Sequence, residues 1–404
     1  MLNSTNSLKI GVIHIYNFPY GLAPTTRITA YCKGLISQGH HVDIFSIEPQ
    51  NNNSKYPIRG YCDGGNYFHF SRMPKRRIPL ITGWTLIIYN IIRLLLYIRS
   101  SHKKHGYDAM ILSCDEPYQL RIFSSYLKFL KNIKVIAIAD EYPIPIRKYL
   151  KDSIPVRKIN RYKSVYGKID ARILMTKKLQ QFYDEVICEK PTLLLSTIVD
   201  TDRFMNLCRI HNSREYMCYM GNMELTKDNV DNIIYAFNYI KDKYPDLDLH
   251  LYGDPCKETF DNLTSIIKNN NLESRVYIKG RVSYNEVPSI LYNAKILVSS
   301  QPDTKRAEGG FPTKLGEYFM TGVPTLLTDV GEITKYVHNN VNGYCVPPCD
   351  PQAYANMIEY IMEHYDESLV VAQNAKKYII DNFGYQIAGE KIKAFINKID
   401  NLNH

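Results

Sequence analysis

The chain has 404 residues, which is enough for two domains that each bury a hydrophobic core. Its composition, 45% hydrophobic and 22% charged, is typical of a globular protein, and the net charge is +10. This charge suits anionic ligands or an anionic membrane surface. We exclude nucleic acid as the expected partner, because no zinc-finger, helix-turn-helix or aromatic nucleic-acid-binding signature accompanies the charge.

The cysteines and the N-terminal residues indicate whether a metal site is expected and in which cellular compartment the protein lies. Nine cysteines are spread singly, and Cys345 and Cys349 have no matching second pair, so no metal site is predicted. Residues 1–9 are polar and lack the apolar core of a secretory leader. Free thiols in a reducing cytoplasm are therefore expected.

The N-terminal half begins with the pattern of a doubly wound α/β fold. An apolar strand (9–16) runs into a loop around Gly21, then a helix from about Thr25 and a second strand (41–48). Gly21 is either a ligand-facing glycine or a plain turn glycine. The GxGxxG fingerprint is absent, so no dinucleotide is inferred. Further apolar runs at 108–114, 134–141, 171–177 and 192–200 predict more strands of the same sheet.

Acidic residues follow one of these strands. Asp140 and Glu141 come at the end of the run 134–141. Parallel sheets place their chemistry at the carboxyl ends of their strands, so we expect Asp140 or Glu141 to touch substrate. Solvated loop carboxylates are the alternative.

Residues 72–106 carry an almost wholly apolar stretch between two basic flanks. Its length approaches a bilayer span, but Asn90 and Arg93 near its centre would be costly in hydrocarbon. The preferred interpretation is a helix that packs on the domain and presents an apolar and basic edge, with Trp84, to the anionic inner face of a membrane. A core helix and a transmembrane span are the alternatives.

A second series of alternating strands and helices follows a polar linker at 211–215. Its strands are expected at 216–223, 247–253, 275–280, 295–300, 324–329 and 343–348, with helices between them. The set predicts a second doubly wound domain.

The stretch 308–332, EGGFPTKLGEYFMTGVPTLLTDVGE, follows the strand at 295–300. Pro312 and Thr313 look like a helix start with Thr313 as N-cap, and Gly322 and Pro324 end that helix. The first-turn amides of residues 314–316 would then be unpaired at the positive helix end, which favours phosphate. The alternative is an ordinary strand–helix–strand unit whose glycines serve packing.

The same stretch resembles the donor-site signature of glycosyltransferase family 4. TIVDTDRF (197–204), MGNMELTKDNVDNIIYAF (220–237) and GRVSYNEVPSILYNAKILVSS (280–300) resemble further segments of that family. The resemblance implies the GT-B fold, in which two doubly wound Rossmann-like domains face one cleft. The expected parts are an acceptor-side domain at 1–205, a donor-binding domain at 206–382 and a helix at 383–404 that crosses back.

The resemblance also implies a reaction: retaining, metal-independent transfer of a hexosyl or related sugar from a UDP- or GDP-linked donor to a lipid-linked or polysaccharide acceptor. The enzyme would lie at the inner face of the cytoplasmic membrane and need no cofactor. A nucleotide-sugar epimerase or phosphorylase of the same fold, or a non-catalytic relative that binds glycan or a protein partner, are the alternatives.

Site residues follow from the resemblance. The expected catalytic residues are Glu308, Asp140 and Glu141. The expected donor-binding residues are Gly21, Asn222, Lys227, Gly280, Arg281, Gly309, Gly310, Phe311, Lys314, Leu315 and Glu317, with Lys227 on phosphate and Glu317 on ribose.

Two departures from the family pattern concern this site. Asn222 stands where the family usually has arginine, so either Lys305, Arg306 or Lys314 supplies that charge or the site binds its donor more weakly. Eight residues rather than seven separate the two glutamates, so Glu308, Gly309 or the Gly310 amide would take the first glutamate's place.

Overall fold

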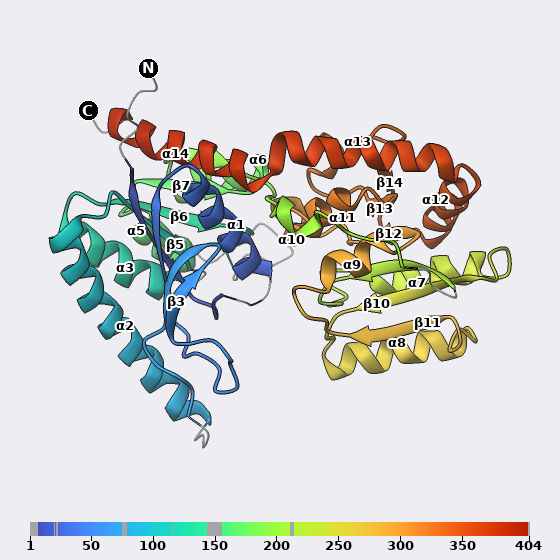
Figure 1. The fold of residues 1–404 in the computed structure, drawn as a ribbon, viewed down its shortest axis with the longest axis horizontal. Coiled ribbons are helices and arrows are strands. Elements are labelled where there is room, and N and C mark those ends of the chain that lie inside the picture. Colours follow the sequence, from blue (N-terminus) through green and yellow to red (C-terminus); the bar gives the residue numbers. More distant parts are fainter. Residues whose placement is uncertain are drawn as a thin grey trace. The chain divides into compact units, whose positions relative to one another are not determined.

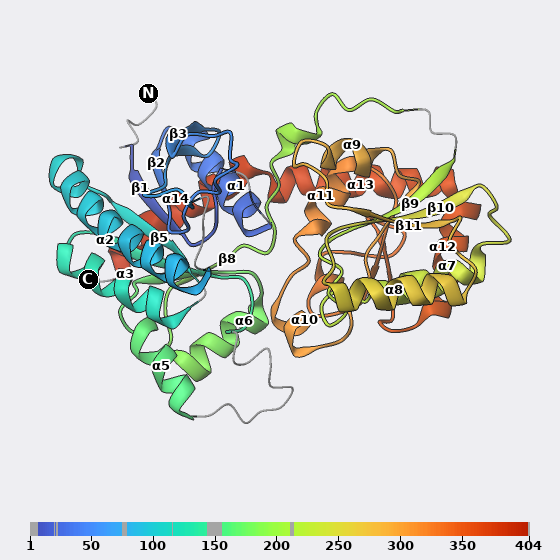
Figure 2. The same ribbon diagram turned by 90° about the horizontal axis from the view of Figure 1, so that it is seen from below.

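The computed structural model describes residues 7–19, 21, 23–74, 79–114, 116–143, 156–210 and 214–402. The chain divides into two compact units, Met1–Ile198 with Tyr385–His404, and Val199–Gly384. Each unit is a sheet of mostly parallel strands with helices on both faces (Figures 1 and 2), which confirms the predicted α/β class with two doubly wound domains.

The first unit contains an eight-stranded sheet in the order β3-β4-β2-β1-β5-β6-β7-β8. The central strands β1, β5 and β6 are almost wholly buried, as their apolar runs predict. The strands are β1 (Lys9–His14), β2 (His41–Ser46), β3 (Arg59–Cys62), β4 (Gly65–Phe68), β5 (Ala109–Ser113), β6 (Lys134–Ala139), β7 (Ala171–Leu174) and β8 (Thr192–Leu194).

The hairpin of β3 and β4 is absent from the sequence-based prediction. These two strands pair antiparallel at the edge of an otherwise parallel sheet. Each has four residues, too few to show an alternating pattern. The sequence signal was the two-residue turn Asp63-Gly64 between them, a combination that favours tight hairpins.

Two separate hydrophobic clusters cover the two faces of this sheet. One face packs against α1 (Ala23–Ser37) and α14 (Tyr385–Leu402). These helices touch at glycines, since a Cβ on Gly34 would lie 2.1 Å from the Tyr385 carbonyl oxygen. The opposite face packs against α2 (Pro79–His105), α3 (Pro117–Leu130) and α5 (Val156–Tyr166). α6 (Lys177–Phe182), η1 (Tyr183–Ile187) and η2 (Thr201–Phe204) follow along the chain, η2 already in the second unit.

The second unit contains a six-stranded parallel sheet in the order β11-β10-β9-β12-β13-β14. The strands are β9 (Glu215–Met220), β10 (Leu247–Tyr252), β11 (Val276–Gly280), β12 (Ile296–Val298), β13 (Thr325–Thr328) and β14 (Tyr344–Val346). The helices are α7 (Val230–Ile240), α8 (Lys257–Asn269), α9 (Val287–Tyr292), α10 (Lys305–Gly309), α11 (Lys314–Thr321), η3 (Ile333–Lys335), α12 (Pro351–Glu363) and α13 (Tyr365–Phe383).

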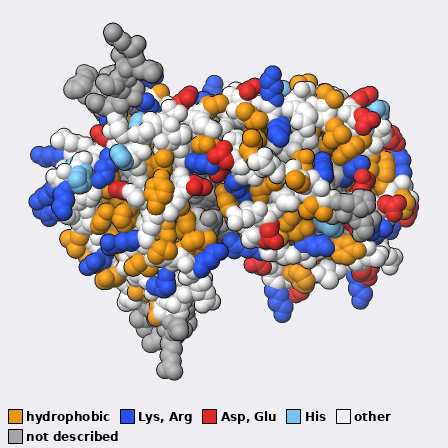
Figure 3. Space-filling model, in the orientation of Figure 1, with side chains coloured by type: hydrophobic (Ala, Val, Ile, Leu, Met, Phe, Trp, Pro, Cys, Tyr) orange, Lys and Arg blue, Asp and Glu red, His pale blue; other side chains and the backbone are white. Residues whose placement is uncertain are grey.

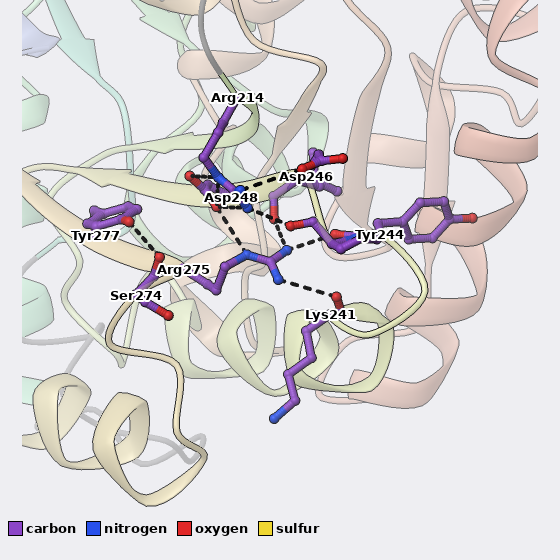
Figure 4. A network of polar contacts seen from close by, with 10 residues as sticks. Arg214, Lys241, Tyr244, Asp246, Asp248, Ser274, Arg275 and Tyr277 are labelled. Atoms are coloured by element: carbon purple, nitrogen blue, oxygen red, sulfur yellow. Dashed lines mark hydrogen bonds and ion pairs between the residues drawn. The ribbon is translucent and has the colours of Figure 1, made fainter.

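A polar network fixes the amino ends of the strands in this sheet (Figure 4). Asp248, near the start of β10, accepts from Arg214 just before β9 and from Arg275 just before β11. Arg275 also donates to the carbonyl oxygens of Tyr244 and Leu247. One carboxylate thus anchors three neighbouring strands at the edge opposite their carboxyl ends.

Candidate functional site

The carboxyl ends of β9 and β10 meet in a tight backbone contact. The Gly221 amide donates to the Tyr252 carbonyl at 2.9 Å. Gly253 has φ 157°, and a Cβ there would lie 1.9 Å from the Gly221 carbonyl oxygen. No side chain fits at position 253, so the backbone after β10 packs directly on the backbone after β9. We call the carboxyl ends of β9–β13, with the loop at 221–229 and the start of α11, the donor edge.

A buried ion pair lies directly beside this loop. The Lys314 ammonium is 2.6 Å from an Asp228 carboxylate oxygen and sits over the Tyr219 ring, 4.5 Å from its centroid. A Cβ on Gly221 would lie 2.7 Å from the Lys314 nitrogen. The structure therefore brings Lys314, from α11, to the glycine loop after β9, although almost 100 residues separate them in sequence.

Burial sets the protonation of this cluster. Burial lowers the pKa of Lys314, and the carboxylate of Asp228 only partly opposes that effect. Burial and the same carboxylate raise the pKa of Tyr219 well above its usual value, so its hydroxyl stays protonated. Asp228 is 2% exposed, and no sequence pattern predicted a role for it. It is the residue that holds Lys314 in place.

Asn222 shapes the loop rather than charging it. Its side-chain oxygen accepts from the Glu224 amide at 3.0 Å, a short-range turn contact. The Lys227 amide in turn donates to the Glu224 carbonyl at 2.8 Å, and the Lys227 side chain is half-buried at the same loop. The arginine expected from the family is thus replaced by a turn-forming residue.

The start of α11 differs from its prediction in two ways. The Leu315 amide donates to the Pro312 carbonyl at 2.9 Å, so the expectation that it is unpaired is wrong. Thr313 is the N-cap residue, as predicted, but it has helical φ −56° and ψ −28° and its side chain makes no cap bond. Gly322 does end the helix in the left-handed conformation, φ 69°. Phe311 is buried against Tyr336, with ring centroids 5.0 Å apart.

Glu308 belongs to a short helix that the sequence did not predict. In α10 its carboxylate is 2.7 Å from the Lys305 ammonium, and Arg306 reaches Glu224 at 3.4 Å. The Gly310 amide donates to the Arg306 carbonyl at 2.9 Å, so it is not available as the predicted substitute for the first glutamate. Gly309 is buried as the last residue of α10. Lys305 and Arg306 thus lie in carboxylate pairs.

Glu317 is held by a partner that sequence reasoning missed. Its carboxylate forms an ion pair with Arg203 of η2. Arg203 also donates to the Tyr284 carbonyl at 2.8 Å and lies over the Tyr284 ring, 3.5 Å from its centroid. Arg203 stands in the TIVDTDRF segment that carried part of the resemblance, which was the available signal. This contact fixes the carboxylate at the donor edge.

Gly280 is the last residue of β11 and Arg281 follows it, at the same sheet edge. Gly280 has φ 72° and accepts from the Gly253 amide at 3.0 Å. The Arg281 side chain is exposed. Both residues therefore lie two strands away from Gly221, because β10 lies between β11 and β9.

The remaining predicted residues lie in the first unit, at the carboxyl ends of β1 and β6. Asp140 lies 3.5 Å from the guanidinium of Arg27, which is 4% exposed. Burial works to lower the pKa of Arg27, but Asp140 and Tyr31 raise it, and the net shift is upward. Glu141 is half-buried beside Asp140. Arg27, on α1, is the partner that sequence reasoning missed.

A buried histidine lies near Gly21. His14, the last residue of β1, contacts the hydroxyls of Ser113 and Thr25, each at 3.1 Å. Burial lowers its pKa to about 3, so the ring is neutral at physiological pH. Gly21 packs on Thr25, since a Cβ there would lie 2.3 Å from the Thr25 hydroxyl. Gly21 thus serves local packing, whatever else it contacts.

Comparison with known proteins identifies the second unit's family. Residues 202–402 match the family model described as glycosyl transferases group 1. This match spans just under half of the chain and supports its placement in the glycosyltransferase superfamily. No curated protein matches the chain by sequence.

Solved structures similar to the glycosyltransferase are GT-B enzymes. Sucrose-phosphate synthase from Thermosynechococcus elongatus has a TM-score of 0.74 at 15% identity, with 98% of this chain and 100% of that chain covered. A glycosyltransferase from Rickettsia africae has 0.71 at 16%, covering 98% and 99%. HepE from Anabaena, solved with UDP, has 0.69 at 13%, covering 97% and 100%. These likenesses confirm the GT-B fold.

Metal binding and membrane crossing can both be assessed for the residues that the structure describes. Among them, no group of three or more histidine, cysteine or acidic side chains is placed to hold a metal ion. No helix within the described ranges has the length and apolarity to cross a membrane.

Proposed function

We propose that this glycosyltransferase is a retaining enzyme that moves a sugar from a UDP- or GDP-linked donor to a lipid-linked or polysaccharide acceptor. The observation that carries the proposal is the donor edge: the glycine loop at Gly221, with Lys227 on the loop and the Lys314–Asp228 pair beside it. The departing diphosphate gains negative charge in the transition state, and fixed cations in that place stabilise it. Similar structures support the donor class, since HepE was solved with UDP and with UDP-glucose.

In this proposal each residue of the donor edge has a role. Lys227 binds the diphosphate, and Lys314 supplies the charge that arginine would give at position 222. Glu317, fixed by Arg203, accepts hydrogen bonds from the ribose hydroxyls. Phe311 packs beneath the site, while the backbone around Gly280 and Arg281 contacts the base.

Glu308 is proposed to approach the donor sugar from α10. Lys305 holds its carboxylate at 2.7 Å, which orients it without burying it. Asp140 and Glu141 of the first unit, the proposed acceptor side, are expected to contact substrate, and Arg27 holds Asp140. As the family resemblance implies, the leaving phosphate takes the acceptor's proton on the same face of the sugar, so no separate base–nucleophile pair is required.

A lipid-linked or surface-glycan acceptor places the enzyme at the inner face of the cytoplasmic membrane. Two similar structures support this acceptor class. TarM from S. aureus was solved with UDP and α-GlcNAc-glycerol, and WaaG is described as involved in lipopolysaccharide biosynthesis. Both are less than 15% identical to this chain, so they guide the choice of acceptors to test.

The proposal is tested by a thermal-shift panel of UDP- and GDP-sugars. A bound ligand stabilises the fold by mass action, so the true donor should raise Tm more than nucleotide sugars that bind more weakly. Donor hydrolysis is then measured for wild type and Glu317→Ala, and the anomeric configuration of transferred sugar is read by NMR. Activity is expected to survive EDTA. Loss of activity in EDTA that manganese restores contradicts the metal-independent mechanism.

The alternatives give different results in the same assays. An epimerase converts the nucleotide sugar without an acceptor, and a phosphorylase requires phosphate as the attacking group. A non-catalytic relative shows no donor turnover in either protein. The replacement of arginine by Asn222 and the shifted first glutamate are the observations that keep this last candidate open.

A further inference from the structure

The helix α2 exposes a stripe of apolar side chains although its other face is buried. Ile91, Leu94 and Ile98 pack against the sheet. Trp84, Ile88, Ile92 and Leu96, spaced four residues apart, are each more than half exposed. At about 1.5 Å per residue the stripe runs for roughly 18 Å. Asn90 lies on the buried face, where its amide donates to the Ile47 carbonyl at 2.8 Å.

The neighbouring helix α3 extends this apolar surface. α2 and α3 lie side by side in Figures 1 and 2, and the Tyr126 hydroxyl donates to the Leu95 carbonyl at 2.9 Å. On α3, Tyr118, Ile122 and Phe129 are exposed, Phe129 by 70%. Exposed apolar residues that gather over two helices mark an interaction surface, whereas single scattered ones do not.

The charge on the same helices has one sign. Ten lysines and arginines and no acidic residue occur in α2, α3 and α5. The rest of the chain therefore holds 40 of each sign, so these three helices carry the entire net charge of +10. Figure 3 shows orange and blue side chains together over this part of the first unit. Lys128 of α3 is paired with Asp170. The cations whose side chains the structure describes are Arg93, Arg99, Lys103, Lys104, Arg121, Lys128, Arg157, Arg161 and Lys163.

We infer that the outer faces of α2, α3 and α5 form a docking surface for an anionic lipid bilayer, with the apolar stripe in the headgroup region and the cations on the lipid phosphates. We call it the basic–apolar face. An acidic protein would also attract the charge. A bilayer fits better because Trp84 and the isoleucines project in a row, as interfacial helices do, and tryptophan favours that interface.

The inference extends the membrane location proposed above from one helix to three, and it does not depend on sugar transfer. Residues 75–78 of the segment first predicted to face the membrane lie outside the described residues. None of the helices in the described ranges combines the length and apolarity needed to cross a membrane. The inferred binding is peripheral and reversible, and each cation near the surface strengthens it about fivefold.

The full-length protein is tested by co-sedimentation with vesicles of phosphatidylcholine, with and without about one third phosphatidylglycerol. Ile88→Asp with Ile92→Asp removes the apolar stripe, and Lys103→Gln with Lys104→Gln removes two exposed cations. The matched controls lie on exposed positions of the second unit: Val370→Asp with Ile380→Asp on α13, and Lys257→Gln with Lys268→Gln on α8.

The expected result is binding to anionic vesicles alone, weakened by salt. The lysine pair lowers the partition coefficient roughly 25-fold, the isoleucine pair abolishes binding, and both controls bind as wild type. Equal binding to neutral vesicles, or equal loss in the controls, overturns the inference. So does a wild-type dimer that the isoleucine pair separates, since the face would then be a protein interface. Nucleotide-sugar binding, measured on the same variants, is expected to stay unchanged. A failure of nucleotide-sugar binding therefore concerns the proposed donor edge and not the basic–apolar face.

Discussion

Breaking the ion pair between Lys314 and Asp228 should destabilise the second unit more than removing both charges. Asp228 is 2% exposed and lies 2.6 Å from the ammonium. Removing one partner of a buried pair costs about 3–5 kcal/mol, because the other charge is left desolvated. Asp228→Asn keeps a hydrogen-bond acceptor, so it should lower the free energy of unfolding by about 3 kcal/mol. Lys314→Met should lower it by an amount at the upper end of that range.

The double variant should cost clearly less than the sum of the two single ones, because no buried charge remains unpaired. Urea unfolding is followed by far-UV circular dichroism, to which the helices and strands of both units contribute. Trp84, the only tryptophan, lies in the first unit, so its fluorescence reports that unit as an internal control. Asp246→Asn removes the exposed partner of Arg214 and should change nothing measurable. Additive costs in the double variant would show that the two side chains do not interact.

Three further predictions follow from single contacts. His14 has a pKa of about 3 in the folded protein and about 6.5 in the unfolded chain, so the free energy of unfolding should fall as the pH drops from about 6.5 to 3. His14→Gln should flatten that slope by up to about 1.4 kcal/mol per pH unit. An unchanged slope contradicts the burial of His14 as a neutral ring. Gly253→Ala places a Cβ 1.9 Å from a carbonyl oxygen and should lower the free energy of unfolding in urea by more than about 2 kcal/mol. Gly280→Ala has open space around it and should lower the same free energy by only about 1 kcal/mol. Equal costs for the two variants refute the close contact at Gly253. Arg203→Met should raise the donor KM about tenfold with kcat little changed, and Glu317→Gln should do the same; a loss confined to kcat would argue against a role in donor binding.

Sequence patterns were sufficient for the parallel strands and insufficient for the short elements. The apolar runs that became β1, β5 and β9 are buried on both sides, so their composition alone marks them. The hairpin β3–β4 and the helix α10 have four or five residues each, and such lengths carry no readable period.

The site shows the same division between local and long-range information. The glycine and lysine of the 221–229 loop could be picked out, because a strand–loop–helix pattern is local. The contacts of Lys314 with Asp228, Glu317 with Arg203 and Asp140 with Arg27 join residues 86 to 114 positions apart in sequence. Only the folded sheet edges bring them together. The unpaired amide predicted at Leu315 failed for a local reason, since Pro312 supplies an acceptor three residues before it.

The central claim is that the donor edge of the second unit binds the diphosphate of a nucleotide sugar. Isothermal titration of wild type, Lys227→Met and the exposed-lysine control Lys257→Met with the best UDP- or GDP-sugar tests it most directly. A charge-assisted contact is worth about 1.5–3 kcal/mol, so Lys227→Met should bind at least tenfold more weakly, while the control binds as wild type. Equal affinity in all three proteins, or no binding of any nucleotide sugar, would contradict the claim.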